Sequence, residues 1–509
     1  MFRLRLVVLA LAALIAMPAT AAIVTLNVTH SANSGAGSLR RAITDANALP
    51  SQDKARILIQ LEETDPILLQ SSLPTINRSV HVEGTGTTRA MINGLSQFAI
   101  IHVSADGSQS IVTLKHLALV NGRNGVGGCL RLHDSTGSFA VDDVHFDGCM
   151  ADTAYGAGGF RGAGGAIYAI GYRMNVTASR FTYNTAVGTQ PAGGAIYYRS
   201  GPGTGNLSIS DTTFATNTAA GNNSSRGGAI YVSQTELEIV DSVFHDNWAV
   251  DDSYAPTSEY YAGGALHTDK SSIVLKRSEF SQNLAGNGGA IKMREGLASD
   301  VSKGLTLVNN SFVGNRAEYA ATIQVHHVDT LLRNNSFFAN GGDGQDFTVN
   351  FNGSYNSIRP DPPSYRFYNN LFTSKHAGTH CGLLPRTAVD SAYNLIPGSG
   401  CGLEDDPTSI VTTGVHLQGY RLDTDWPYAR LGAPLRPFLD STALDAGNPA
   451  AADDNVASAC PLLDGQGNPR VADGNADGLA HCDIGAFESQ REASLFADDF
   501  AQRLHGVAD

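Results

Sequence analysis

The 509-residue chain has few charged residues and no basic segment. Asp, Glu, Lys and Arg make up 16% of it, against about a quarter in an average soluble protein. The formal net charge is −14, and no arginine-rich run is present. These features argue against nucleic acid as a partner, because nucleic-acid-binding domains concentrate basic side chains. The low charge and the 55 glycines favour strands and turns over surface helices.

Long apolar stretches are also missing after the N-terminus. There, Arg3 and Arg5 precede the apolar residues 6–17, and the small residues Ala19-Thr20-Ala21 follow. This order is typical of a secretory signal peptide, here residues 1–21. Its apolar part is shorter than the roughly 20 residues that a membrane-spanning helix needs. We therefore expect an exported mature chain without a transmembrane segment.

Cysteine is scarce, and its spacing is regular. The six cysteines fall into three pairs, each about 20 residues apart. An even number of cysteines in an exported chain indicates disulfides, whereas zinc would need Cys-x-x-Cys spacings that are absent. The predicted disulfides are Cys129–Cys149, Cys381–Cys401 and Cys460–Cys482.

Two short motifs recur in order along the chain, with a period of about 25 to 36 residues. A Gly-Gly-small-aliphatic motif begins at Gly127, Gly164, Gly193, Gly227, Gly263 and Gly288. A Phe-x-x-Asn motif begins at Phe181, Phe214, Phe244, Phe280, Phe312 and Phe337. Units this short cannot bury a hydrophobic face alone, so they must stack. The patterns of leucine-rich repeats and of propeller blades are absent.

Alternation within each repeat predicts how the units stack. After each Gly-Gly pair, alternate residues would point inward: Leu130/Leu132, Ile167/Ala169, Ile230/Val232, Ile291/Met293 and Ile323/Val325. The Gly-Gly pair permits a tight bend with unusual φ, and the stacked Phe would fill the core. Asn tolerates the left-handed region, and stacked Asn side chains can hydrogen-bond from coil to coil. The prediction is an all-β chain that forms a single-stranded, right-handed parallel β-helix.

The paired motifs resemble the repeat of polymorphic outer membrane proteins, over roughly residues 120–345. The resemblance implies a β-helix of the pectin lyase-like fold that is displayed outside the cell. It would be released, or held at the outer-membrane surface of a Gram-negative bacterium.

The N-terminal end of the repeat region predicts a cap. Residues 34–47 indicate a turn followed by a short amphipathic helix, with Leu39, Ala42, Ile43 and Ala46 on one face. The segment resembles the Ser-Leu-Arg-Glu-Ala-Ile segment that opens many secreted β-helix proteins. It would cover the edge of the first coil, because an open solenoid edge invites aggregation.

The C-terminal end carries three ordered blocks, at 443–448, 464–470 and 482–488, which resemble the choice-of-anchor Q domain. That resemblance implies a surface protein. The expected divisions are a signal peptide at 1–21, the cap at 22–54, the β-helix at 55–430, the choice-of-anchor Q-like segment at 431–489 and an acidic flexible tail at 490–509.

The outward positions of the strands are where a binding function can reside. The residue after each inward Ile or Leu forms a column that includes Tyr168, Tyr197 and Tyr231. An aromatic face packs well on the C–H groups of a sugar, although Tyr is also simply a good strand residue. We expect a non-catalytic protein that binds or adheres to a polysaccharide, a cell-surface glycan or the cell envelope.

Insertions between each Asn turn and the next Gly-Gly pair add further aromatic residues. They contain Trp248, Tyr260 and Tyr261 and would emerge along one edge beside the Tyr column. Insertions of a repeat protein on one edge often mark its binding face. We therefore add these three residues to the expected glycan site.

The alternative is a polysaccharide lyase or glycoside hydrolase that acts on an acidic polysaccharide, because such enzymes share this fold. A lyase needs a base and a group that neutralises the uronate. The best cluster for these roles is His267, Asp269, Lys292 and Arg294. The signatures of polygalacturonases do not appear as a set, so the sequence favours binding over catalysis.

One acidic turn, 473–478, carries oxygen ligands at alternate positions and a glycine, as in an EF-hand loop. Its twelfth position is Ile484 instead of Glu. We expect either a weak structural calcium site formed by Asp473, Asn475, Asp477 and Asp483, or an acidic turn without a metal.

Overall fold

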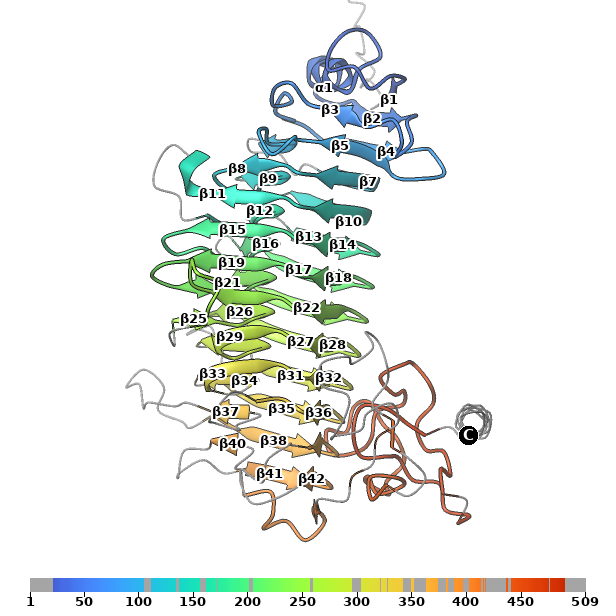
Figure 1. The fold of residues 1–509 in the computed structure, drawn as a ribbon. Coiled ribbons are helices and arrows are strands. Elements are labelled where there is room, and N and C mark those ends of the chain that lie inside the picture. The colour runs from blue at the N-terminus through green and yellow to red at the C-terminus, as the bar shows by residue number, and fades with distance from the viewer. Residues whose placement is uncertain are drawn as a thin grey trace, which may run out of the picture.

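The protein is a parallel β-helix, as the repeats predict (Figure 1). The structure is a computed structural model. It describes residues 22–104, 111–133, 137–155, 162–171, 173–200, 205–256, 260–294, 304–320, 322–326, 328–341, 349–351, 363–373, 381–382, 389–396, 402–412, 415, 417, 436–437, 441–475 and 477–489. The predicted signal peptide and acidic tail lie outside these residues, as does Cys401 of the predicted Cys381–Cys401 disulfide.

Within the described residues, the strands of the coils form three parallel sheets, called A, B and C below. Sheet A has 24 strands: β1 (Ile23–Val28), β2 (Lys54–Ile59), β3 (Ile67–Leu68), β4 (Val80–Gly84), β5 (Ala90–Asn93), β7 (Ile111–Val120), β10 (Ser138–Asp147), β13 (Arg173–Thr177), β14 (Arg180–Thr182), β17 (Asn206–Ser210), β18 (Thr213–Ala215), β22 (Glu236–Val240), β23 (Val243–His245), β27 (Ser272–Lys276), β28 (Glu279–Ser281), β31 (Leu305–Val308), β32 (Ser311–Val313), β35 (Thr330–Arg333), β36 (Ser336–Phe338), β38 (Tyr365–Tyr368), β39 (Leu371–Phe372), β41 (Val389–Ala392), β42 (Leu395–Ile396) and β43 (Ile410–Val411).

Sheet B has 10 strands: β6 (Ile101–Ser104), β9 (Leu130–His133), β12 (Ile167–Ile170), β16 (Ile196–Arg199), β21 (Ile230–Ser233), β26 (Leu266–Asp269), β30 (Ile291–Arg294), β34 (Ile323–His326), β37 (Val349–Phe351) and β40 (Cys381–Gly382). Sheet C has 9 strands: β8 (Arg123–Asn124), β11 (Met150–Asp152), β15 (Thr185–Gly188), β19 (Thr218–Gly221), β20 (Ser225–Arg226), β24 (Trp248–Val250), β25 (Tyr261–Ala262), β29 (Leu284–Asn287) and β33 (Arg316–Ala320). A short 3-10 turn (Thr153–Tyr155) follows β11.

The core inside the coils matches the predicted alternation. The inward residues of sheet B, such as Ile167, Ala169 and Ile230, are fully buried. One Phe per coil stacks on the next, with ring centroids 4.7–5.0 Å apart, along Phe146, Phe181, Phe214, Phe244, Phe280, Phe312, Phe337 and Phe372. This column confirms that the Phe of the repeat fills the core.

The Asn of the repeat forms a buried hydrogen-bond ladder. Each Nδ2 donates to the Oδ1 of the next coil at 2.8–3.0 Å, along Asn184, Asn217, Asn247, Asn283, Asn315 and Asn340. The same Nδ2 also donates to a Phe carbonyl oxygen of the preceding coil. The expectation of a left-handed Asn is wrong: the residue before it has the positive φ, as Thr216 (57°) and Asp246 (54°) show. The amide satisfies buried backbone groups at the turn.

Each glycine of the Gly-Gly pair is required for a different reason. Gly193 has a φ of +68°, a conformation that residues with a Cβ rarely adopt. A Cβ on Gly194 would lie 2.0 Å from the carbonyl oxygen of Gly228 in the next coil. The first glycine therefore makes the bend, and the second lets neighbouring coils approach.

The helix α1 (Leu39–Ala48) covers the N-terminal end of the solenoid (Figure 1). Its buried residues are Leu39, Ala42, Ile43 and Ala46, which confirms the predicted apolar face. Ser38 caps it by accepting a hydrogen bond from the Arg41 N–H. Within the described residues, no helix is long and apolar enough to span a membrane.

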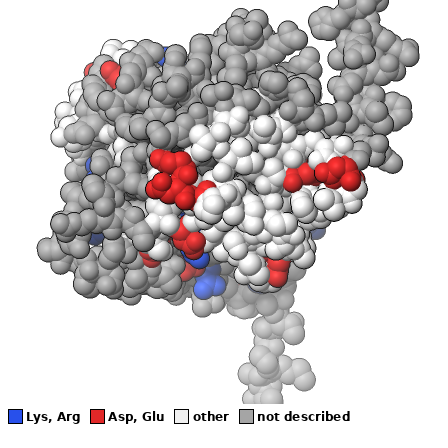
Figure 2. Space-filling view, turned by 90° about the horizontal axis from the view of Figure 1, so that it is seen from below, with Lys and Arg blue, Asp and Glu red and all other residues white. Residues whose placement is uncertain are grey.

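The C-terminal segment packs against the side of the last coils (Figure 1). Arg333 donates to the carbonyl oxygen of Ala459 at 2.7 Å, and Arg470 donates to Oδ1 of Asn309 at 2.8 Å. Two predicted disulfides are formed, Cys129–Cys149 and Cys460–Cys482, with Cα atoms 5.6 and 6.5 Å apart. Seen from below, the described surface carries separate groups of acidic side chains (Figure 2).

Candidate functional site

The outer face of sheet B carries a continuous column of aromatic side chains. The register aligns Tyr168, Tyr197, Tyr231 and His267 on successive strands. Ring centroids are 5.1, 5.1 and 5.6 Å apart, and neighbouring planes are inclined by 16°, 18° and 23°. The structure therefore brings the three predicted Tyr residues together and adds His267 to their stack.

The stacking changes what the column offers to a ligand. Tyr197 lies between Tyr168 and Tyr231, so both faces of its ring are occupied. Tyr168 and Tyr231 are each 7% exposed. Burial raises the pKa of the Tyr168 hydroxyl to about 12. The sequence suggested that a sugar packs on the ring faces, but the faces inside this stack are already covered. A sugar would meet ring edges and hydroxyl groups instead.

Asp269 is the centre of the polar groups that continue the column. Its carboxylate accepts hydrogen bonds from the Tyr231 hydroxyl at 2.8 Å and from His267 Nε2 at 3.4 Å. Arg226 and Arg294 place guanidinium nitrogens 3.9 and 4.0 Å away. Burial opposes ionisation of Asp269, but the hydrogen bonds and Arg226 hold its pKa well below the ordinary value. Asp269 is therefore a carboxylate at neutral pH.

His267 is almost fully enclosed. Its Nδ1 lies 3.3 Å from the carbonyl oxygen of Ala262, on the side opposite the contact with Asp269. Burial lowers the pKa of His267, and the neighbouring Arg226 and Lys292 act in the same direction. A neutral ring carries one proton for two acceptors, so the hydrogen bond from Nε2 to Asp269 leaves Nδ1 without a proton for the carbonyl oxygen of Ala262.

Lys292 is the next member of the column. It is 6% exposed. Its Nζ donates to Oε1 of Gln324 and lies 2.8 Å from Nε2 of His326. The register places Lys292 beside His267 and Arg294 beside Asp269. All four residues predicted for a lyase thus lie on two adjacent strands, β26 and β30.

The structure does not bring the three predicted insertion residues together: Trp248 follows the turn from sheet A into sheet C, whereas Tyr260 and Tyr261 precede the turn from sheet C into sheet B. Trp248 begins β24 of sheet C and donates from Nε1 to Oδ1 of Asp246 at 2.7 Å, so it is not part of the Tyr column. Tyr261 is buried and pairs with Ser225, whereas Tyr260 is 64% exposed. Of these three residues, Tyr260 presents most of its surface to solvent.

Arg226 belongs to the cluster but carries no signal in the repeat motifs. It ends the short strand β20 and precedes Gly227. The Gly-Gly pair that follows Arg226 turns the backbone from sheet C into sheet B. The Arg226 side chain reaches the carboxylate of Asp269 on β26. Only the placement of the coil against its neighbour reveals this contact.

The acidic turn does not assemble the predicted calcium ligands. The side-chain oxygens of Asn475 and Asp477 accept hydrogen bonds from backbone N–H groups of the same turn. Asp483 is buried, and its two oxygens accept hydrogen bonds from the backbone of Asp445 and Ser489. Within the described part of the chain, no three His, Cys, Asp or Glu side chains are placed to hold a metal ion.

Comparison of the sequence with models of known protein families and with curated proteins gives no match.

Proposed function

We propose that the protein is an exported or cell-surface β-helix that binds a glycan through the outer face of sheet B. The observation that supports this proposal most is the cluster around Asp269 at the end of the Tyr column. It joins a carboxylate, a Tyr hydroxyl and two guanidinium groups. Binding sites combine apolar and aromatic surface with a few convergent polar groups.

The chemistry of the cluster suits a polyhydroxylated ligand. Sugar hydroxyl groups donate and accept hydrogen bonds, so they need both kinds of partner close together. Asp269 is an acceptor, whereas Arg226 and Arg294 are donors. The ring edges of Tyr231 and Tyr197 border these groups and give apolar surface beside them.

Export is the second part of the proposal. It is supported by the signal-peptide pattern at 1–21 and by the two disulfides, which persist in oxidising compartments. The resemblances to the polymorphic outer membrane protein repeat and to the choice-of-anchor Q domain agree with a location outside the cell.

The enzyme alternative is weaker because its candidate base is already engaged. Lys292 is almost fully buried, and its Nζ contacts Gln324 and His326. A lyase base must reach the proton that it abstracts. Asp269, held ionised among cations, is equally unsuited to act as a general acid.

A panel of neutral and acidic polysaccharides tests both functions. We expect the mature protein to bind at least one of them without releasing unsaturated ends, which are followed by ultraviolet absorbance. Loss of binding in Asp269→Asn, with unchanged binding in the exposed control Glu238→Gln, supports the site. Unsaturated ends that disappear in Lys292→Ala would replace the binding function with a lyase.

A further inference from the structure

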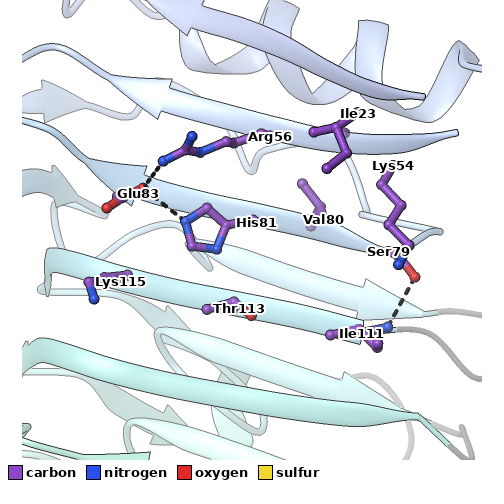
Figure 3. Close-up of a pocket in the computed structure, with 11 residues that line it drawn as sticks. Ile23, Lys54, Arg56, Ser79, Val80, His81, Glu83, Ile111, Thr113 and Lys115 are labelled. Carbon is purple, nitrogen blue, oxygen red and sulfur yellow. Dashed lines mark hydrogen bonds and ion pairs between the residues drawn. The ribbon is translucent and has the colours of Figure 1, made fainter. Parts of the chain in front are cut away.

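A second polar site lies on the outer face of sheet A, near the N-terminal end of the solenoid (Figure 3). It is an open groove of about 430 Å³, bordered by side chains from β1, β2, β4 and β7. Figure 3 shows Lys54 and Arg56 on β2, His81 and Glu83 on β4, and Lys115 on β7. The groove is separate from the Asp269 cluster, which lies on sheet B.

The strand register explains why these side chains meet. Ala55 pairs with Val80, and Val80 pairs with Val112, so these residues point inward. The residues on either side of them point outward in two columns. One column runs through Ile23, Lys54, Ser79 and Ile111, and the other through Arg56, His81 and Thr113. Small side chains at Ser79 and Thr113 leave the hollow between the longer ones.

The groove is rich in cations although the chain as a whole is acidic. Among the described residues that line the groove, Glu83 is the one with a carboxylate. Its Oε2 accepts hydrogen bonds from Arg56 at 2.8 Å and from His81 at 3.0 Å. The Arg56 hydrogen bond, followed by that of His81, lowers the pKa of Glu83. Lys115 forms an ion pair with Asp142 at 2.9 Å, outside the groove lining. Lys54 forms no ion pair or side-chain hydrogen bond within the described residues.

Hydrogen-bond donors outnumber acceptors in this groove. Within the described residues, the three N–H donors of the Lys54 ammonium group form no hydrogen bond. Arg56 donates from only one of its guanidinium nitrogens there. Ser79 accepts a hydrogen bond from the Ile111 N–H at 3.0 Å, which leaves its own O–H to donate. A ligand that completes these bonds must be anionic and must supply oxygen acceptors.

We propose that this groove binds a phosphate group carried on a partly apolar molecule. A phosphate monoester has close to two negative charges at neutral pH and three acceptor oxygens, and a phosphodiester headgroup keeps one negative charge and two such oxygens. Either group matches donors that converge from several strands. Ile23 and Ile111 are 70% and 53% exposed at one side of the groove, where they offer apolar contact to the rest of the molecule. The phosphate belongs either to a soluble ester or to a lipid headgroup. This inference is independent of the glycan site.

Calorimetric titration of the mature protein with phenyl phosphate tests the soluble source, with phenol as the uncharged comparison. We expect binding of the phosphate ester alone, which weakens as salt is raised. Lys54→Gln should weaken it at least tenfold. The control Lys276→Gln removes an outward Lys of the same sheet that already pairs with Glu238, and it should leave binding unchanged.

Co-sedimentation with vesicles of phosphatidylglycerol or of phosphatidylcholine tests the lipid source. Both vesicles carry phosphate, but only phosphatidylglycerol has a net negative charge that attracts the ammonium group of Lys54. Retention on phosphatidylglycerol that is lost in Lys54→Gln and reduced in Ile23→Ser assigns a lipid headgroup. Titration with phenyl phosphate that responds to Lys54→Gln assigns a soluble ester. Absence of binding in both assays, or equal binding by Lys54→Gln with an unchanged circular dichroism spectrum, overturns the proposal.

Discussion

The Tyr231 hydroxyl donates a hydrogen bond of 2.8 Å to Oδ2 of Asp269, which lies on the next coil of the solenoid. The bond joins the aromatic column to the charged cluster, because Tyr231 stacks on Tyr197 and Asp269 contacts His267. Burial and the adjacent carboxylate raise the pKa of Tyr231 above its ordinary value. The hydroxyl therefore stays protonated and remains a donor to Asp269 at neutral pH.

Asp269 should make the free energy of unfolding decrease as the pH falls into the acidic range. Its folded pKa lies below the ordinary value of about 3.9. The group therefore stabilises the fold above that value, and this contribution is lost as the pH falls through the folded pKa. We expect Asp269→Asn to be less stable than the unmodified chain at pH 7, and the difference to shrink below about pH 4.

Urea unfolding of both proteins at neutral and acidic pH measures this difference. Glu238→Gln serves as the matched control, because Glu238 lies on the exposed face of sheet A. A gap between Asp269→Asn and the unmodified chain that stays constant down to strongly acidic pH would show that Asp269 has no depressed pKa.

The fold could be predicted from the sequence because its determinants are local and repeated. Alternation around Ile167 and Ile230 identifies the inward positions, and the recurring Phe and Asn identify the columns of the turns. A second Asn ladder runs from Asn310 through Asn335 and Asn370 to Asn394, and in its first three members the Asn lies two residues before the Phe of the repeat. The repeat motif did not include this position, because the earlier coils carry Ser or Thr there, as at Ser179 and Thr212.

The buried Asn ladder should be a main source of stability. Asn247→Ala removes the acceptor of the Asn217 N–H and Nδ2 groups. It also removes the side-chain donor to the carbonyl oxygen of Phe214 and to Oδ1 of Asn283. Each unsatisfied buried group costs about 1–3 kcal/mol. We expect a loss of at least about 2 kcal/mol in the free energy of unfolding, measured by urea denaturation. A loss equal to that of Glu238→Ala, an exposed truncation, would mean that the ladder contributes little.

The C-terminal segment should depend on one buried ion pair. Arg470 and Glu488 are both buried, with NH1 and Oε2 3.3 Å apart, and Arg470 also donates to the carbonyl oxygens of Asp483 and Gly485. Removal of one partner from a buried pair costs about 3–5 kcal/mol. Arg470→Met should therefore make residues 441–489 sensitive to protease under conditions in which the coils survive.

The double variant Arg470→Met/Glu488→Gln separates the charge from the packing, because Gln keeps an oxygen acceptor for backbone N–H groups that bind Glu488. It removes both charges and should recover part of the protease resistance, because an unpaired buried carboxylate is no longer left behind. Equal sensitivity of the single and double variants would assign the effect to lost packing of the Arg470 side chain.

The mature chain should begin at Ala22. The Ala22 nitrogen lies 3.0 Å from Oδ1 of Asp53, and β1 begins at the next residue. Cleavage after Ala21 would turn this nitrogen into an ammonium group that pairs with Asp53. Intact-mass measurement of the exported protein checks the N-terminus, and a chain that begins at any other residue contradicts the prediction.

The site was only partly predictable, for a geometric reason. Alternation shows that Tyr197, Asp269 and Lys292 point outward. It does not show that strands about 4.8 Å apart press identical rings face to face, which removes the sugar-packing surfaces inside the column. Nor does it show that Arg226, from another sheet, reaches Asp269.

The central claim, that the Asp269 cluster binds a glycan, is tested most directly by one dissociation constant. The constant is measured by calorimetry for the best polysaccharide of the panel, with the unmodified protein, Tyr231→Phe, Asp269→Asn and the double variant. We predict that each single change weakens binding about tenfold or more. We also predict that the double variant binds more weakly than the unmodified protein by a factor smaller than the product of the two single factors. The two effects overlap because both residues act through one hydrogen bond. Unchanged affinity in Asp269→Asn, with the fold intact, would contradict the account.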